Sequence, residues 1–177
     1  MLGTGTAEEF IDDAEHHNQW WSDGTSPELS QAADLTPRSD FHRVLKGTNT
    51  HYTDDVESLV YAIHGQTGIG KTTLLHQLIA ALLNTTNFTH QNTDHELTSS
   101  IEPRQILYIP LEDSLYQLER EGDDIKRLDQ VIDYFQTHVA PRQGQKFILF
   151  DDVQALDLDE DQKAELLDLV DENTYVF

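Results

Sequence analysis

The chain has 177 residues, of which 33 are Asp or Glu and 11 are Lys or Arg, so its formal net charge at pH 7 is −22. Such an acidic surface repels nucleic-acid phosphates and anionic lipid headgroups, because both are bound through basic side chains. The chain has no cysteine, which excludes disulfides and thiolate metal sites. It shows neither a run of about 20 apolar residues nor a secretory signal pattern over 1–13. We therefore expect a cytoplasmic protein with no membrane association.

The acidic residues are spread along the whole chain, from Glu8-Glu9 to Asp171-Glu172, and are not gathered in one tail. Asp outnumbers Glu by 20 to 13, and Lys occurs five times. This composition resembles that of halophilic proteins, with an ordinary acidic protein as the alternative. Molar salt shortens the Debye length to about 3 Å and screens self-repulsion. On this interpretation the negative charge is an adaptation to a salt-rich solvent and says little about binding partners. A DNA partner is then neither excluded nor supported.

Residues 1–57 are expected to form an N-terminal helical extension and linker. The apolar spacing over 7–21 predicts an amphipathic helix with Trp20 and Trp21 on its apolar side, where core packing is favoured over stacking on a base. The stretch 22–27 predicts a turn, and residues 40–46 predict a short helix.

From residue 58 the pattern changes to strands that alternate with helices, which predicts a parallel sheet covered on both faces. Strands are expected at 59–63, 106–111, 147–150 and 174–177, helices at 72–83, 125–139 and 160–170, and an exposed loop at 84–103. The expected fold class is α/β: a three-layer αβα core over 58–177, incomplete at its C-terminus and preceded by the helical extension.

Residues 65–72 fit the Walker A pattern G-x-x-x-x-G-K-[ST] and lie between a predicted strand and a predicted helix. Glycine at these positions lets backbone N–H groups turn toward an anion, and the helix N-terminus adds a partial positive charge. Lys71 is expected to reach the β- and γ-phosphates of ATP as a catalytic residue, and the Thr72 hydroxyl to bind Mg²⁺. The predicted nucleotide-binding residues are Gly65, Gln66, Thr67, Gly68, Ile69, Gly70, Lys71, Thr72 and Thr73.

The apolar strand 147–150 ends in Asp151-Asp152, which indicates a Walker B motif. Asp151 is expected to complete the Mg²⁺ shell begun by Thr72. Asp152 is the predicted catalytic base that orients or deprotonates the attacking water. Glu112, at the end of another predicted strand, is a rival base, although a solvated acid is the favoured interpretation there.

Two other candidates are set aside. His90 and His95, with acids between and beside them, could bind a transition metal, but a polar loop is favoured. Arg38 could reach the nucleotide, but a surface position is favoured.

The layout resembles P-loop ATPases of the AAA-like superfamily, and most closely prokaryotic ATPases that pair this core with a C-terminal nuclease-like domain of unknown function. The agreement runs through 18–21, 38–45, 65–75, 106–113 and 147–154. The family usually has Pro-Arg-x-Val where this chain has residues 66–69, and Asp-Glu where it has Asp151-Asp152. The loop is also similar to that of origin-recognition ATPases, and the acid pair to that of signalling ATPases that turn over slowly.

The resemblance implies ATP binding and slow Mg²⁺-dependent hydrolysis, since Asp152 is one methylene shorter than Glu. A nucleotide-dependent switch with little turnover and an inactive fragment are the alternatives. It also implies a sheet order of 5-1-4-3-2, in which residues 174–177 form the fourth strand. We therefore expect a truncated core without a sensor, lid or arginine finger, whose missing parts would contact a protein partner or a second copy.

Overall fold

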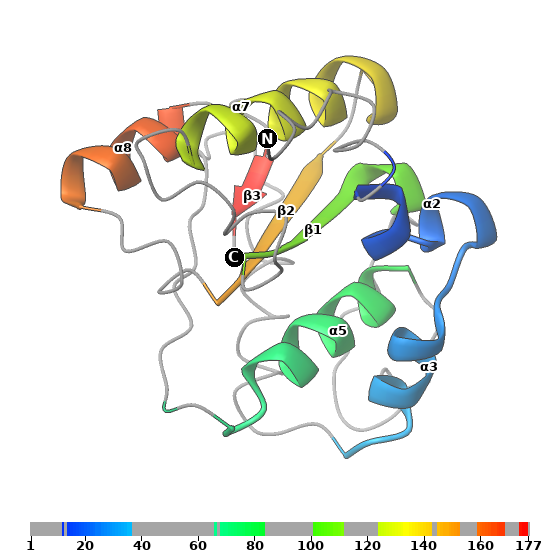
Figure 1. Ribbon diagram of the computed structural model, residues 1–177. Coiled ribbons are helices and arrows are strands. Elements are labelled where there is room, and N and C mark those ends of the chain that lie inside the picture. The colour runs from blue at the N-terminus through cyan, green and yellow to red at the C-terminus, as the bar shows by residue number, and fades with distance from the viewer. Residues whose placement is uncertain are drawn as a thin grey trace, which may run out of the picture.

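Three parallel strands form the sheet in the part of the chain that the structure describes. The computed structural model describes residues 12, 14–36, 66, 68–83, 101–111, 124–142, 145–152, 159–168 and 174–176. The strands are β1 (Ile106–Pro110), β2 (Lys146–Asp151) and β3 (Thr174–Val176), in the order β1-β2-β3 (Figure 1). Ile106 is paired with Phe147, and Ile148 with Val176. In the expected order 5-1-4-3-2, these are the second, third and fourth strands, and their adjacency is confirmed. The predicted first strand, 59–63, lies outside the described residues.

Helices pack against both faces of this sheet. Helix α5 (Lys71–Leu82) lies on one side and α7 (Asp124–Tyr134) on the other, with the strands between them (Figure 1). Alternate residues of a strand point to opposite faces, so each strand contributes to two hydrophobic clusters. The α5 cluster contains Leu75, Leu78, Ile79, Leu82, Ile106, Tyr108, Phe147 and Leu149. The α7 cluster contains Leu107, Ile109, Leu128, Val131, Ile132, Phe135, Ile148, Phe150 and Val176.

The predicted elements of this core are largely confirmed. Helix α7 continues into a π-helical turn, η3 (Phe135–Val139), so helical structure reaches residue 139 as expected. Helix α8 (Glu160–Asp168) lies within the predicted 160–170. The prediction of an exposed loop over 84–103 is wrong at its C-terminal end. Ile101 is buried, and a 3₁₀ turn, η2 (Pro103–Gln105), begins at Pro103. The predicted helix 40–46 lies outside the described residues.

The prediction of one continuous helix over 7–21 is wrong, because the helical structure is interrupted at residues 18 and 19. Residues 14–17 are helical, Asn18 and Gln19 form a turn, and a new short helix, α2 (Trp20–Asp23), follows. The predicted turn 22–27 is shorter than expected, because α2 runs to Asp23 and α3 (Pro27–Ala33) begins at Pro27. The Ser26 hydroxyl accepts a hydrogen bond from the Leu29 N–H, which caps α3.

The break at Asn18 has a tertiary cause, since this side chain binds the outer edge of β1. The Asn18 amide donates to the Tyr108 carbonyl at 3.0 Å, and its oxygen accepts from the Tyr108 N–H at 2.7 Å. The indoles of Trp20 and Trp21 both donate to the Ile106 carbonyl, at 3.3 and 2.7 Å. The N-terminal segment therefore satisfies backbone groups that an edge strand would otherwise expose. Trp20 is 2% exposed, so its predicted core position is confirmed.

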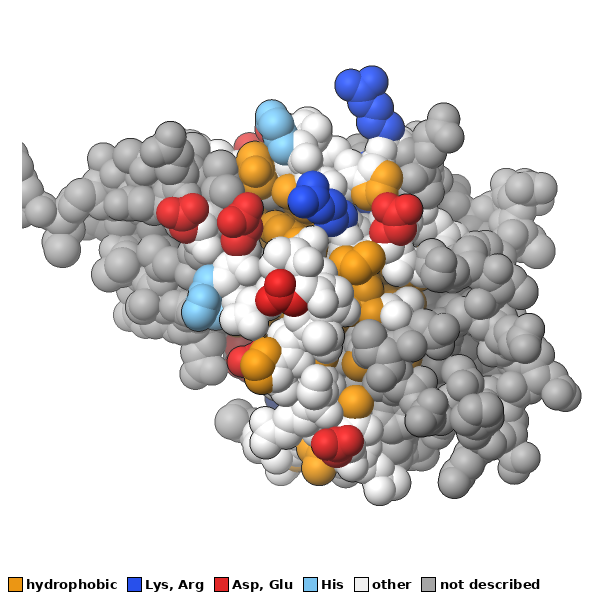
Figure 2. Space-filling model, turned by 90° about the vertical axis from the view of Figure 1, so that its right-hand side faces the viewer, with side chains coloured by type: hydrophobic (Ala, Val, Ile, Leu, Met, Phe, Trp, Pro, Cys, Tyr) orange, Lys and Arg blue, Asp and Glu red, His pale blue; other side chains and the backbone are white. Residues whose placement is uncertain are grey.

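The described residues on one face of the molecule include several acidic side chains (Figure 2). In Figure 2 they are scattered among polar and apolar side chains over the described part of this face. Within the described ranges, the structure contains no helix that is long and apolar enough to span a bilayer.

Candidate functional site

The loop over 65–72 that fits the Walker A pattern, called the phosphate loop below, has in its described part the backbone that the glycine pattern predicts. Gly68 and Gly70 have φ angles of 81° and 91°, a region that side chains with a Cβ rarely adopt. A Cβ built on either glycine meets nothing within 4 Å, so the loop borders open space. Gly65 and Thr67, which were also predicted to bind nucleotide, lie outside the described residues.

Helix α5 begins without the usual chemistry of a helix N-terminus. Its N-cap residue is Gly70, no side chain caps it, and its first turn contains no acid. In contrast, α8 begins with the reciprocal pair Asp159 and Gln162 and carries two acids in its first turn. Negative charge stabilises a helix N-terminus, and acidic residues are abundant in this chain. The first turn of α5 therefore has no negative group of its own, and a helix end of this kind can accept an external anion.

Lys71 lies at the first position of α5 and reaches back across the loop. Its ammonium donates to the Gln66 carbonyl at 3.1 Å, and the Ile69 N–H donates to the same carbonyl at 3.4 Å. Thr72 is exposed and Thr73 is half-buried. The side chain of Ile69 is 41% exposed. The loop therefore presents its lysine and its first threonine at the surface, where a nucleotide can contact both.

Asp151 ends β2 and is 4% exposed, although it carries a carboxylate. The Tyr108 hydroxyl of the neighbouring strand donates to Asp151 Oδ2 at 2.8 Å. The Asp151 carbonyl accepts from the Leu111 N–H at 3.0 Å. Buried charged groups are held by such hydrogen bonds. Both interactions fix Asp151 at the carboxyl end of the strand pair, where ligands bind in parallel α/β sheets.

Asp152 follows with an unusual backbone. Its φ of 57° is the one positive φ among non-glycine residues in the described ranges, and its side chain is half-buried. Asp and Asn tolerate this left-handed conformation better than longer or branched residues. The conformation turns the chain sharply just after β2. It also favours a short acid over a longer side chain at this position.

Two aromatic residues connect Asp151 to the phosphate-loop helix. The ring of Tyr108 lies 5.0 Å from the ring of His76, which is on α5. Burial and the nearby Asp151 charge raise the pKa of Tyr108 above its ordinary value of 10.0, so its hydroxyl keeps the proton that it donates. Burial lowers the pKa of His76 below 6.5, with Asp151 and Glu28 opposing the shift. His76 is therefore neutral at pH 7.

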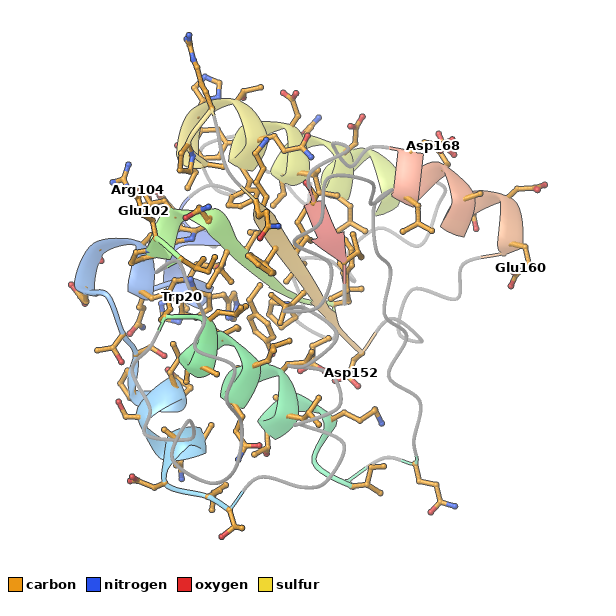
Figure 3. The ribbon with its side chains drawn as sticks, turned by 180° about the vertical axis from the view of Figure 1, so that it is seen from behind. Trp20, Glu102, Arg104, Asp152, Glu160 and Asp168 are labelled. Carbon is orange, nitrogen blue, oxygen red and sulfur yellow. The ribbon has the colours of Figure 1, made fainter. Side chains whose placement is uncertain are left out.

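Two described parts of the predicted site lie on one side of the molecule. Asp152, at the tip of β2, lies on the same side as the first turn of α5 (Figures 1 and 3). The family model of the AAA domain matches residues 57–177, which is more than half of the chain. The chain belongs to the AAA domain family. No curated protein and no solved structure is significantly similar to it.

AAA domains are P-loop ATPase domains, so the match indicates nucleotide binding. The residues present fit a nucleotide with Mg²⁺: the loop borders open space, no side chain caps the α5 N-terminus, and Thr72 and Asp151 carry oxygen atoms of the kind that Mg²⁺ prefers.

The other predicted site residues are not placed. Glu112, Arg38 and the loop with His90 and His95 lie outside the described residues. Within the described residues there is no group of three or more His, Asp or Glu side chains that could hold a metal ion.

Asn18, His76 and Tyr108 were not predicted from the sequence as parts of the site's surroundings. Tyr108 is the middle residue of an apolar strand, where a tyrosine is typically core. The register that places it beside the Asp151 strand is not visible in the sequence.

Proposed function

We propose that this chain binds ATP and hydrolyses it slowly with Mg²⁺. The observation that carries the proposal is the start of α5, where two glycines with positive φ lead into a helix that begins with Lys71 and has neither a side-chain cap nor an acid in its first turn. A phosphate chain supplies the negative charge that this helix end lacks.

The triphosphate would be held mainly by backbone N–H groups of residues 65–73. Gly65, Gly68 and Gly70 would let the backbone wrap the β- and γ-phosphates, and Gln66, Thr67 and Thr73 would contribute their N–H groups. The Ile69 N–H would join them in place of its bond to the Gln66 carbonyl. Lys71, which donates to the Gln66 carbonyl, would turn its ammonium to the phosphates.

Mg²⁺, when bound, would neutralise developing charge on the phosphates. Thr72 would hold it through its exposed hydroxyl, and Asp151 through its carboxylate, directly or through water. The burial of Asp151 supports this role, because the attraction between a carboxylate and a cation is stronger where the dielectric constant is low.

Asp152 would act as the base that orients the attacking water. It is shorter than Glu, and a misplacement of about 1 Å can cost on the order of 100-fold in rate. Its left-handed backbone, with φ of 57°, supports a fixed but short-reaching carboxylate. The expected result is slow turnover, and the same feature favours a nucleotide-dependent switch as the second candidate function.

Phosphate release measured against time in molar KCl separates the two functions. An ATPase releases phosphate slowly but continuously, loses this activity in Lys71→Ala and Asp152→Asn, and changes its rate in Asp152→Glu. A switch binds ATP and releases almost none. Equal rates in the wild type and both Asp152 variants would contradict the role of Asp152. An inactive fragment would show neither binding nor release.

The proposed setting is a cytoplasm rich in salt, and the proposed fold is a three-layer αβα core over 58–177 with an N-terminal helical extension over 1–57. The net charge of −22, spread over the chain, supports a halophilic protein, because salt screens its self-repulsion. The temperature of unfolding should then rise as KCl is raised from about 0.1 M to the molar range. A partner protein or a second copy remains a proposal, and DNA remains unsupported.

A further inference from the structure

Tyr108 occupies the point where three parts of the molecule meet. Its hydroxyl donates to Asp151 Oδ2 at 2.8 Å. Its ring makes an edge contact with the ring of Trp20 on α2, with centroids 6.5 Å apart, and the centroid of the His76 ring on α5 lies 5.0 Å away. Its backbone N–H and carbonyl are both bound by the Asn18 side chain. The hydroxyl is thus held by contacts to its ring and to its backbone.

The geometry gives this hydroxyl a specific effect on Asp151. A carboxylate rotates about its Cβ–Cγ bond unless hydrogen bonds fix it. Within the described part of the chain, Tyr108 is the hydrogen-bond donor to this carboxylate, and it engages one of the two oxygens. The bond therefore orients the carboxylate through Oδ2 and does not occupy Oδ1.

We infer that Tyr108 is a positioning residue that orients Asp151 for Mg²⁺, and that the N-terminal segment, through Asn18 and Trp20, holds Tyr108 in place for this purpose. The inference rests on the proposed function, because it assumes that Asp151 serves a Mg²⁺–nucleotide complex. Residues that hydrogen-bond a metal ligand commonly alter metal affinity on the order of 10-fold or more when they are removed.

The test compares Tyr108→Phe with the wild type. Phenylalanine keeps the ring that contacts Trp20 and His76 and removes only the hydroxyl. Tyr134→Phe is the matched control, because Tyr134 is half-buried on α7 and stacks on His138 at 5.1 Å. The readout is the fluorescence of a methylanthraniloyl-ATP probe, titrated once in EDTA and once with increasing Mg²⁺, at a temperature at which circular dichroism shows each variant folded.

The expected result is a split between the two titrations. Tyr108→Phe should bind the probe in EDTA as the wild type does, and should need on the order of 10-fold more Mg²⁺ for the half-maximal effect of the cation. Tyr134→Phe should match the wild type in both. Asp151→Asn should also raise the Mg²⁺ requirement, and adding Tyr108→Phe to it should cause no further change, because Tyr108 acts through Asp151.

Three results would overturn the inference, and they can be told apart. An unchanged Mg²⁺ requirement in Tyr108→Phe would show that the hydroxyl does not serve the cation. An equal loss of probe affinity with and without Mg²⁺ would show a structural role alone. If the wild type does not bind the probe, or Lys71→Ala binds it equally well, the proposed function fails and the inference fails with it.

Discussion

Asn18→Ala tests how the N-terminal segment stabilises the sheet. Asn18 is 0% exposed and makes three hydrogen bonds to backbone groups. Its amide donates to the Ala14 carbonyl at 2.7 Å and to the Tyr108 carbonyl at 3.0 Å, and its oxygen accepts from the Tyr108 N–H at 2.7 Å. The substitution removes all three bonds and changes no charge.

The expected loss follows from the groups that remain. Ala14 and Tyr108 are 3% and 7% exposed, so water reaches their backbone groups poorly. A buried polar group that loses its partner costs about 1–3 kcal/mol. Allowing for some relaxation of the edge, we expect Asn18→Ala to lower the free energy of unfolding by about 3–5 kcal/mol. That is a large share of the roughly 5–15 kcal/mol typical of a domain.

Urea unfolding followed by far-ultraviolet circular dichroism in molar KCl measures this loss. Gln31→Ala is the control, since Gln31 is exposed on α3 and its replacement should change the free energy by no more than about 0.5 kcal/mol. Asn18→Asp at pH 7 should cost at least as much as Asn18→Ala, because a carboxylate cannot donate to either carbonyl and repels both.

A loss below about 1 kcal/mol in Asn18→Ala would refute the reasoning, because it would be smaller than the cost of one unsatisfied buried group. So would an Asn18→Asp variant as stable as the wild type. Either result would mean that water replaces the Asn18 amide at the edge of β1.

Three further predictions concern α5. Gly70→Ala should lower the free energy of unfolding by about 1–2 kcal/mol and weaken ATP binding. The cause is the φ of 91° alone, since nothing lies within 4 Å of the new Cβ. Unchanged urea unfolding and unchanged ATP affinity would contradict this prediction. Leu78→Ala should cost about 2–5 kcal/mol in urea unfolding, because Leu78 is 0% exposed in the core; a cost below 1 kcal/mol would contradict the packing. Burial lowers the pKa of His76 in the folded state. As the pH drops through 6.5, the unfolded chain therefore binds a proton at His76 more readily than the folded chain does, and the free energy of unfolding falls. His76→Gln should therefore lose less stability than the wild type between about pH 7.5 and 5.5, and an equal loss would contradict the burial argument.

The sequence predicted those parts of the fold that local patterns determine. The spacing of leucines over 72–83 predicted α5, and the apolar run 147–150 predicted β2, because burial on one helix face or inside a parallel sheet leaves a period in the sequence. The phosphate loop was predicted for the same reason, since its glycines are needed by the local backbone. Helix α3 was missed, although Ser26, Pro27 and Glu28 form a recognisable helix start.

The missed parts depend on contacts between distant residues. The break at Asn18 serves Tyr108, which is 90 residues away along the chain. The hydrogen bond between Tyr108 and Asp151 depends on the register of two strands, and the left-handed backbone of Asp152 depends on how the chain leaves β2. None of these features leaves a periodic or local pattern.

Equilibrium binding of ATP to the wild type and to Lys71→Ala, measured by calorimetry in molar KCl with Mg²⁺, tests the central claim most directly. Lys71 is only half-buried, so its replacement should leave the fold intact by circular dichroism. The account predicts that the wild type binds ATP and that Lys71→Ala binds it at least 10-fold more weakly, at a cost of about 1.4 kcal/mol or more. Equal affinity in the two proteins, or no binding by a folded wild type, would contradict it.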